Sequence, residues 1–382
     1  MDYDLIVVGA GPVGASLAAA TRGLRGIVLA HERRALRVAT EGVFDSRVYA
    51  LSPGNVEFLR GLGIWSRLAP GRLEPVHAMR VFGDDGASAL ELDAYRAGVP
   101  EIAWIVEDGA LQDALWAALD VEVVAPAECE GLEVGPDRAT LQLRAGRALT
   151  GKLVAGADGA ASFVRRAAGI TATERDYGQA AVVANFRCDK PQPGTAWQWF
   201  QGGPVLALLP LPGDQVSMVW SLPAAQAARI ARLDAEALCA EVELASRGSL
   251  GALSLAAPPR SYPLRRLSAA RLVAPRVALL GDAGHVIHPL AGQGLNLGLQ
   301  DARSLAATLA GRGARDPGEP GLLRRYERSR AEPILAMDAV VGGLFDLFGA
   351  QNELIAKMRN AGLNLTDRLP VLKNILIRHA MG

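Results

Sequence analysis

The sequence predicts an α/β fold with two kinds of sheet, one parallel and covered by helices, the other mostly antiparallel. Two observations indicate the parallel part. A buried strand at 5–8 runs through glycines into an alanine-rich helix, and a second strand–loop–helix unit spans 277–301. Closely spaced apolar segments between 180 and 223 indicate the antiparallel part. A chain of 382 residues is long enough for two domains with sizeable cores.

Composition and charge exclude several classes of protein. Lys plus Arg and Asp plus Glu both number 40, so nothing indicates a nucleic-acid partner. The three cysteines are far apart in the sequence, which is typical of free thiols in a reducing compartment. Asp2 and Asp4 stand where a secretory signal would be basic, and no uncharged apolar run reaches the ~18 residues of a membrane-spanning helix. We therefore expect a cytoplasmic protein.

The first motif is a run of glycines between a strand and a helix. Gly9, Gly11 and Gly14 form GxGxxG directly after the strand at 5–8, which is the fingerprint of a Rossmann-like dinucleotide-binding domain. Gly9 makes the tight turn, Gly11 admits the pyrophosphate, and Gly14 allows the helix to pack on the strand. Glu32, after a second strand at 27–30, is expected to accept hydrogen bonds from the adenosine ribose.

The middle of the chain alternates short strands with turns and one helix. Apolar segments at 79–82 and 89–92 flank the turn residues Gly83 to Gly86, which predicts a hairpin. A helix is expected over 109–119, with Gln112 away from its apolar face. Further strands are expected at 121–124 and 139–144.

The segment from Ala180 to Pro223 reads as antiparallel strands with few charges. We expect four strands, within 181–187, 196–201, 205–209 and 216–222. Such a sheet would form an apolar wall of a binding site. Its tryptophans and phenylalanines either fill the core or line the site, and the sequence leaves that choice open.

The unit at 277–301 combines a strand at 277–280, a break at Gly281 and Asp282, and a helix that begins near Gly294 or Leu295. The start of that helix would present free N–H groups and a positive dipole end to a bound anion. His285 and His288 have a spacing that can hold a metal on a helix. Because Pro289 and glycines favour a loop and no third ligand is evident, a hydrogen-bonding role is expected for His285.

These motifs together resemble the class A flavin-dependent aromatic hydroxylases, and most closely the ubiquinone-biosynthesis hydroxylases. The resemblance covers nearly the whole chain. It is carried by GDAGHVIHPLAGQGLNLG (281–298), by GADGAASFVR (156–165), by DSRVYAL (45–51) with LGIW (62–65), and by GPVLALLPL (203–211) with VWS (219–221). Gly284 stands where alanine is usual.

The resemblance implies a fold and a reaction. An FAD-binding domain (1–75, 100–179 and 271–335) would be interleaved with a mostly antiparallel substrate domain (76–99 and 180–270), and a helical region (336–382) would end the chain. Only one dinucleotide fingerprint is present, so FAD would take it and NAD(P)H would have no separate domain. NAD(P)H would reduce FAD, and O₂ would then form a flavin C4a-hydroperoxide that hydroxylates a polyprenylated phenol in ubiquinone biosynthesis.

The resemblance also implies site residues, without a protein nucleophile or base. Arg165 is expected beside a phosphate, and Asp282 is expected to matter more to FAD binding than Asp301. The flavin-edge candidates are His288, Pro289, Gly292, Gln293 and Gly294. The expected cofactor-binding residues are Gly9, Gly11, Pro12, Val13, Gly14, Glu32, Arg33, Arg47, Gln112, Asp158, Gly281, Asp282, Pro289, Gly292, Gly294, Leu295 and Asn296.

The expected partner is a hydrophobic polyprenyl-phenol substrate, and the oligomeric state is left open. The basic tail at 357–381 carries an apolar stripe, which suits either an interfacial helix on anionic lipid or a helix packed on the body. Peripheral contact with the inner membrane, or with a quinone-biosynthesis complex, is the corresponding expectation. Three alternatives remain: a hydroxylase of another small aromatic compound, an isoprenoid-lipid reductase, and a non-catalytic assembly protein that keeps FAD.

Overall fold

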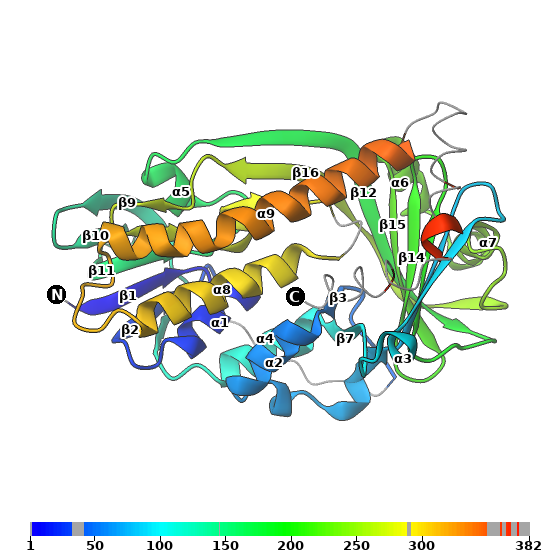
Figure 1. Ribbon diagram of the computed structural model, residues 1–382, viewed down its shortest axis with the longest axis horizontal. Helices are drawn as coiled ribbons and strands as arrows, with labels where there is room; N and C mark the ends of the chain where they lie inside the picture. Colours follow the sequence, from blue (N-terminus) through cyan, green and yellow to red (C-terminus); the bar gives the residue numbers. More distant parts are fainter. Residues whose placement is uncertain are drawn as a thin grey trace.

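The computed structural model describes residues 2–32, 42–144, 146–288, 292–349, 360, 364–367 and 373. Figure 1 shows an elongated molecule with one sheet at each end and long helices running between them. Both sheets draw on segments that are far apart in the sequence.

The first sheet is the predicted parallel one, and it has the strand order β17–β18–β11–β1–β2–β8. Neighbouring strands from β18 to β8 all pair in parallel. Two further strands, β9 and β10, extend it from β11 in antiparallel fashion. The bounds are β1 Tyr3–Val8, β2 Gly26–Leu29, β8 Glu122–Val124, β9 Cys129–Val134, β10 Ala139–Leu143, β11 Ala148–Gly156, β17 Val273–Ala274 and β18 Val277–Leu279.

Alternate residues of these strands point to opposite faces of the sheet, so the two faces have different neighbours. Helices cover one face. Leu5 and Val7 of β1 pack with residues of α1, α8 and α9, whereas Ile6 and Val8 pack with β9, β10 and α5. Helices α2 and α4 form a further layer against α1. The bounds are α1 Pro12–Ala20, α2 Pro53–Gly61, α4 Asp108–Ala117, α5 Phe163–Ala167, α8 Gly294–Ala310 and α9 Pro320–Gly349.

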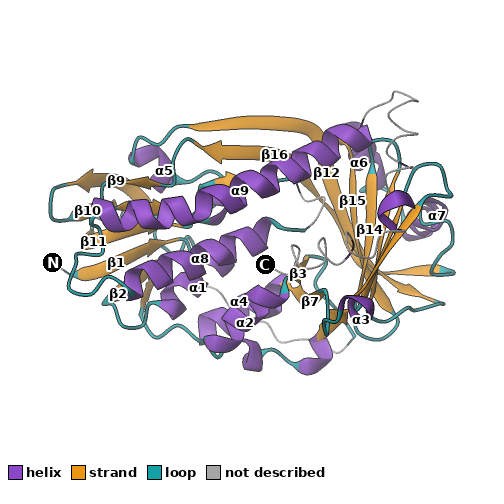
Figure 2. Ribbon diagram, in the orientation of Figure 1, coloured by secondary structure: helices purple, strands orange, loops and turns teal. Residues whose placement is uncertain are grey.

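The second sheet is the predicted antiparallel one, with the order β19–β16–β12–β15–β14–β13–β5–β6. Its pairs are antiparallel except for β13 with β5. Figure 2 shows it as a fan of strands with α6 and α7 on its outer side. The bounds are β5 Ala78–Phe82, β6 Ala89–Asp93, β12 Ala172–Cys188, β13 Thr195–Phe200, β14 Val205–Pro210, β15 Gln215–Pro223, β16 Leu253–Ala269, β19 His285–Val286, α6 Ala224–Ile230 and α7 Ala235–Ala245.

A small third sheet, which the sequence pattern did not predict, joins the two larger ones. It consists of β3 (Val48–Leu51), β7 (Ala103–Glu107) and β4 (Leu73–Val76). One of its sides packs with α1, α2 and α4, and the other packs with Ala196 of the antiparallel sheet and with Leu211, which follows β14. The remaining short elements are η1 Trp65–Arg67, η2 Pro70–Arg72, α3 Ala94–Ala97 and η3 Gly281–Ala283.

The end of the chain is described at only a few positions beyond α9. The side chains of Asn360 and Asn364 donate hydrogen bonds to Asp84 and Ser88, and Asp367 accepts one from the backbone of Glu91. These positions therefore pack on the β5–β6 hairpin, while the expected apolar stripe lies outside the described residues. The domain boundaries inferred from the sequence stay a prediction. Within the described ranges, no helix is long and apolar enough to cross a membrane.

Candidate cofactor and substrate site

A cavity of about 550 Å³ opens at the carboxyl ends of β1 and β2, where parallel sheets bind ligands. Five residues predicted from motifs up to 149 positions apart gather there: Gly9, Gly11, Glu32, Gln112 and Asp158. The cavity is also lined by Val8, Ala10, Leu29, Ala30, His31, Trp116, Ala127, Glu128, Cys129, Ala157, Ala161 and Phe163.

The three glycines of the fingerprint have different surroundings. A Cβ on Gly9, whose φ is +104°, would lie 2.2 Å from the carbonyl oxygen of Ala157, and one on Gly14 would lie 2.0 Å from that of Gly9. A Cβ on Gly11 would meet nothing within 4 Å. Gly11 also precedes α1 without a side-chain cap, so no side chain satisfies the first N–H groups after Pro12. This arrangement fits the pyrophosphate of FAD.

Asp158 and Arg165 shape the loop after β11. The carboxylate of Asp158 accepts hydrogen bonds from Ser162 Oγ (2.5 Å) and from the backbone N–H of Val164 (3.1 Å). The guanidinium of Arg165 is buried and donates to the carbonyl oxygens of Ala160 (2.7 Å) and Ala283 (2.8 Å). These donors tie this loop to η3, and the expectation that Arg165 holds a phosphate stays a prediction.

Several cavity-lining residues escaped the sequence analysis. Trp116 donates a hydrogen bond from its indole nitrogen to the carbonyl of Ala10 (2.9 Å), and Glu128 and Cys129 reach the cavity after β8. Burial and the nearby Asp158 raise the pKa of the Cys129 thiol to about 12, so it stays protonated. The strand at 121–124 was predicted. Its pairing beside β2, which brings these residues to the cavity, has no local sequence signal.

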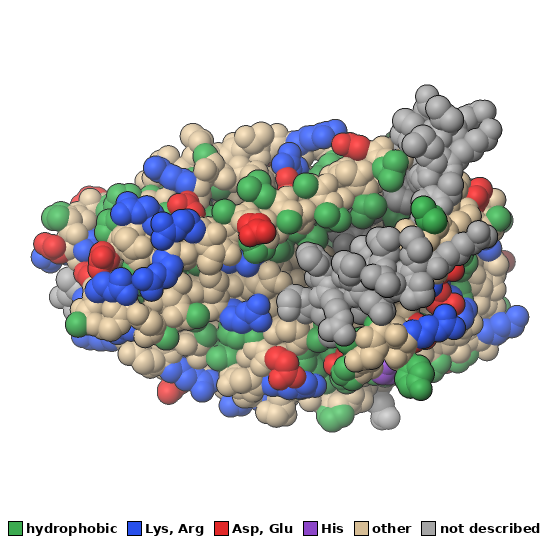
Figure 3. All heavy atoms as spheres, viewed as in Figure 1, with side chains coloured by type: hydrophobic (Ala, Val, Ile, Leu, Met, Phe, Trp, Pro, Cys, Tyr) green, Lys and Arg blue, Asp and Glu red, His purple; other side chains and the backbone are tan. Residues whose placement is uncertain are grey.

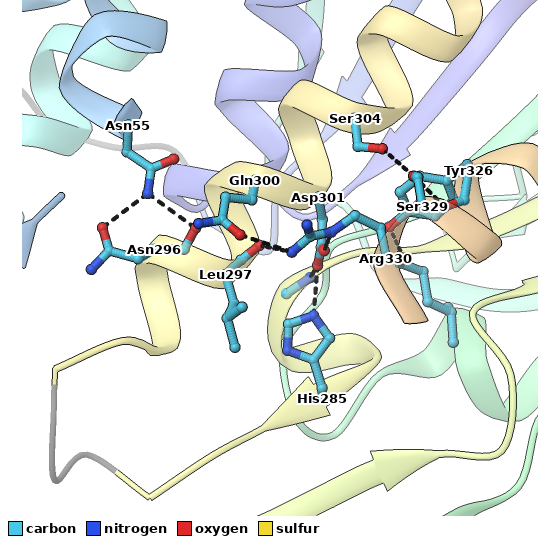
Figure 4. Close-up of polar contacts among 12 residues, drawn as sticks. Asn55, His285, Asn296, Leu297, Gln300, Asp301, Ser304, Tyr326, Ser329 and Arg330 are labelled. Atoms are coloured by element: carbon cyan, nitrogen blue, oxygen red, sulfur yellow. Dashed lines mark hydrogen bonds and ion pairs between the residues drawn. The ribbon is translucent and has the colours of Figure 1, made fainter. Parts of the chain in front are cut away.

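The Gly281 turn is held by the buried carboxylate of Asp301. Asp301 Oδ2 accepts the backbone N–H of Gly281 (2.9 Å) and contacts His285 Nε2 (2.6 Å), while its Oδ1 accepts from Arg330 Nε (2.6 Å). Figure 4 shows this convergence of three elements on Asp301. The hydrogen-bonding role expected for His285 is confirmed, and Asp301 is the centre of the network, not an ordinary helix residue.

Asp282 is the side chain that the turn leaves exposed. Although its surface is open, protein surrounds it at longer range, and this desolvation raises the pKa of Asp282 despite the opposing charges of His285, Arg47 and Arg265. The Arg47 guanidinium lies 5.5 Å from the ring centre of Tyr49 and 6.0 Å from that of Tyr262. Arg47 and Asp282 therefore share one electrostatic environment.

A polar network also forms around Asp108, at the start of α4. Its Oδ1 accepts hydrogen bonds from Tyr49 Oη (2.9 Å) and from Gln112 Nε2 (2.6 Å). The predicted cofactor residue Gln112 is thus oriented by Asp108 while lining the cavity. The network places Tyr49, which lies next to Arg47 in space, on the same side of the site.

The helix that the sequence predicted near Gly294 is α8, and Gln293 precedes it without a side-chain cap. Gly292 has a φ of +60°. The Asn296 carboxamide is buried; it donates to the carbonyl of Ala50 and accepts from Ser52 N and Asn55 Nδ2. Its side chain therefore joins α8 to β3 and α2, so that a cofactor contact of Asn296 would come from its backbone.

The other predicted residues of this group differ in position. Val13 packs against α8, where a Cβ on Gly298 would lie 2.5 Å from Val13 Cγ2. Pro12 is the first residue of α1 and Leu295 is the second of α8, and Arg33 and Pro289 lie outside the described residues.

His288 lies beside the flavin-edge segment but is buried. Its Nε2 is 3.2 Å from Gln179 Oε1, and its ring contacts Tyr177 edge-on (4.8 Å) and Phe345 of α9 (5.0 Å). Burial lowers the pKa of His288 to about 4, so it is neutral at pH 7. The His288 side chain therefore packs between β12 and α9.

The antiparallel sheet separates its aromatic residues from its site-facing residues. Trp197, Trp199, Trp220 and Phe186 pack under α6 and α7, so these aromatic rings belong to the core. The opposite face packs against β3, β7 and α8, and it combines apolar side chains such as Phe200 and Val205 with the buried polar residues Asn185, Gln198 and Ser217. The question that the sequence left open is thereby answered for the four residues under α6 and α7.

Comparisons with known proteins agree with this site. The FAD binding domain family matches residues 2–338. The chain is 34% identical to ubiquinone hydroxylase UbiL of Rhodospirillum rubrum (99% of this chain, 89% of that protein) and 34% identical to 3-demethoxyubiquinol 3-hydroxylase of Escherichia coli (99% and 98%).

Solved structures show the same fold at lower sequence identity. Klebsiella pneumoniae HpxO, in complex with FAD and uric acid, superposes with a TM-score of 0.76 at 21% identity, over 98% of this chain and 96% of that one. The sheet topology therefore agrees with the match to the FAD binding domain family. The chain belongs to the FAD-dependent aromatic monooxygenases, in the family of the ubiquinone-biosynthesis hydroxylases.

Proposed function

We propose that the chain hydroxylates the aromatic ring of a polyprenylated phenol in ubiquinone biosynthesis, using FAD, NAD(P)H and O₂. The observation that carries the substrate class is the absence of buried charged side chains, among the described residues of β12 to β15, on the face that the antiparallel sheet turns toward α8 and the third sheet. FAD, when bound, accepts reducing equivalents from NAD(P)H and activates O₂. The chain's own residues hold the ring, exclude water and present N–H groups to developing negative charge.

The alternative substrate, a small aromatic acid, would need a partner for its carboxylate. Burying an unpaired carboxylate costs several kcal/mol. Arg187 is the sole arginine between 180 and 223. It is half exposed and bonds Asp214 at 3.1 and 3.3 Å. Arg187 therefore forms a surface ion pair near the end of β12, which supports the lipid substrate.

The test follows NAD(P)H oxidation and hydroxylated product with 2-farnesylphenol and with 4-hydroxybenzoate. Wild type should give coupled product only with the prenylated phenol, and Arg187→Ala should change this little. Arg229→Ala, which removes a surface ion pair with Glu241 far along the chain, is the matched control. Efficient hydroxylation of hydroxybenzoate that Arg187→Ala abolishes would overturn the proposal.

We also propose that the chain meets its lipid substrate at the surface of the inner membrane, as a peripheral protein. The basic tail at 357–381 supports this. Leu335 and Val340 of α9 support it as well, since 67% and 58% of their surfaces are exposed. Figure 3 shows apolar side chains along α9, and blue side chains gathered toward the end where α9 begins.

A further inference from the structure

One row of residues runs across the site-facing side of the antiparallel sheet. Cross-strand pairs join Val183 to Val219, Val219 to Ala207, Ala207 to Gln198, and Gln198 to Val81. Because paired residues project to the same face, these five side chains form one strip across β12, β15, β14, β13 and β5. Gln198 is its one polar member.

The rows on either side of this strip are covered. On one side, Ala196 and Leu209 pack with the third sheet through Val76 and Ile105. On the other side, Phe200 and Val205 pack with a cluster that contains Ile287, Leu297 and Val341.

The middle of the strip is partly open to solvent. Ala207 and Val219 are partly exposed although both lie in central strands. The segments on the opposite side approach closely, since a Cβ on Gly292 would lie 3.9 Å from that of Ala50. The strip therefore lies between the rows that pack with the third sheet and those that pack with α8.

Gln198 is a buried amide without a protein partner. It is 7% exposed, and within the described ranges its carboxamide makes no hydrogen bond. Other amides of the sheet donate to the backbone, Asn185 to the carbonyls of Phe44 and Asp45 and Gln215 to that of Gly42, while Asn185 Oδ1 and Gln215 Oε1 are buried without a partner. Gln198 differs from them because its polar atoms are not fully buried, so its carboxamide is open to a ligand that supplies its partner.

We propose that Gln198 is a specificity-determining residue that binds the oxygen substituent of the aromatic ring. The inference rests on the proposed function and names the contact that orients its substrate. A carboxamide both donates and accepts, so it can pair with a phenol O–H or with a methoxyl oxygen, whereas an isoprenoid tail offers it nothing. Val183, Val219 and Ala207 would hold the apolar part of the ring beside it. The ring edge that meets the flavin then follows from which oxygen pairs with Gln198.

The test compares two ligands that differ by one hydroxyl, 2-farnesylphenol and farnesylbenzene. Their Kd values are measured by calorimetry on the FAD-loaded protein, and the hydroxylated product per NAD(P)H is measured for the phenol. Wild type should bind the phenol about tenfold more tightly, in line with one hydrogen bond made or left unmade. Gln198→Leu should bring the two Kd values to within about twofold and lower the product yield per NAD(P)H.

Gln201→Leu is the matched control. Gln201 follows β13 on the side of Trp197 and Trp199, where it donates to the carbonyl of Ala245 (3.1 Å) and accepts from Trp220 Nε1 (3.3 Å). Gln201→Leu should leave the ratio of Kd values as in wild type. Gln198→Met, an unbranched replacement, repeats the test if Gln198→Leu does not fold.

Three results would overturn the inference: equal binding of both ligands by wild type, a tenfold preference kept by folded, FAD-loaded Gln198→Leu, or the same loss in Gln201→Leu. Failure of the proposed function has a different signature. Wild type would then give no hydroxylated phenol, while the ratio of Kd values would still report whether Gln198 recognises the hydroxyl.

Discussion

His285 Nε2 lies 2.6 Å from Asp301 Oδ2, with both side chains buried, beside the Gly281 turn. Asp301 also bonds Arg330 and the N–H of Gly281. Burial alone would raise the pKa of Asp301, but His285 and Arg330 lower it below its usual value. The network therefore couples α8, α9 and η3 through one carboxylate.

Asp301→Ala should lower the free energy of unfolding by about 3–5 kcal/mol, because it leaves Arg330 buried without its carboxylate. The measurement is urea unfolding of the FAD-free protein. Asp338→Ala is the control: it breaks the ion pair with Arg266, which is 37% exposed, and should cost about 1 kcal/mol or less. Equal costs for the two variants would contradict the role of Asp301.

Asp282→Ala should act on FAD affinity and leave stability nearly unchanged. Within the described part of the chain the Asp282 carboxylate accepts no hydrogen bond from protein groups, and its surface is exposed. Losing a charge-assisted hydrogen bond to the cofactor should weaken binding by roughly 1.5–3 kcal/mol. Fluorescence titration with FAD measures this, and an affinity equal to wild type would remove Asp282 from the cofactor site. Asp301→Ala differs from Asp282→Ala because its main effect should be on the free energy of unfolding.

The sequence predicted the parts of this structure that have a local signature. The glycine fingerprint, the parallel strands and the start of α8 follow from spacing within short windows, and the structure confirms them. Asp301 and Arg330 are 29 positions apart, so no window contains their contact. The third sheet likewise needs three short segments to meet.

The two faces of the antiparallel sheet could not be assigned from the sequence for a different reason. Both faces of β12 and β15 are buried, so the alternation of apolar and polar residues that marks an exposed face is missing. Alternation along the strand separates Gln198 from Trp197 and Trp199, but only the observed packing shows that the tryptophan face lies under α6 and α7.

Gly11→Ala should weaken FAD binding at least tenfold, about 1.4 kcal/mol, without destabilising the apoprotein. The added Cβ meets no protein atom within 4 Å, and the φ of Gly11 is −68°, which alanine adopts freely. Any loss must then come from the ligand that approaches this backbone. Gly61→Ala in α2, where a Cβ also meets nothing, is the control. Wild-type affinity in Gly11→Ala would mean that the pyrophosphate lies elsewhere.

Binding to lipid should depend on the positive charges of the tail. Replacing Arg359, Arg368 and Arg378 by Gln should reduce co-sedimentation with anionic vesicles, and salt should reduce it in wild type because it shortens the Debye length. Lys373 is left in place since it pairs with Asp367. The control replaces Arg144, Arg147 and Arg229, which pair with acids elsewhere on the surface. Equal binding to neutral and anionic vesicles would exclude this mode of contact.

Stability should fall as the pH drops from about 6.5 to 4, and His288 should account for much of the loss. An unfolded histidine takes up a proton below its ordinary pKa of about 6.5. In the folded protein, burial lowers the pKa of His288 to about 4, so protonation favours the unfolded chain throughout that interval. The difference corresponds to on the order of 3 kcal/mol.

The measurement is urea unfolding of FAD-free protein at pH 7.5 and pH 4.5, for wild type and for His288→Gln. Gln keeps a polar partner for Gln179 but does not titrate, so the variant should lose less stability between the two values. The effect of Asp301 is separate. A carboxylate whose pKa is lowered stabilises the fold above its unfolded pKa of 3.8 and loses that contribution only as the pH falls further. If His288→Gln follows the same pH curve as wild type, His288 is protonated in the fold, and its burial between Tyr177 and Phe345 does not hold it neutral.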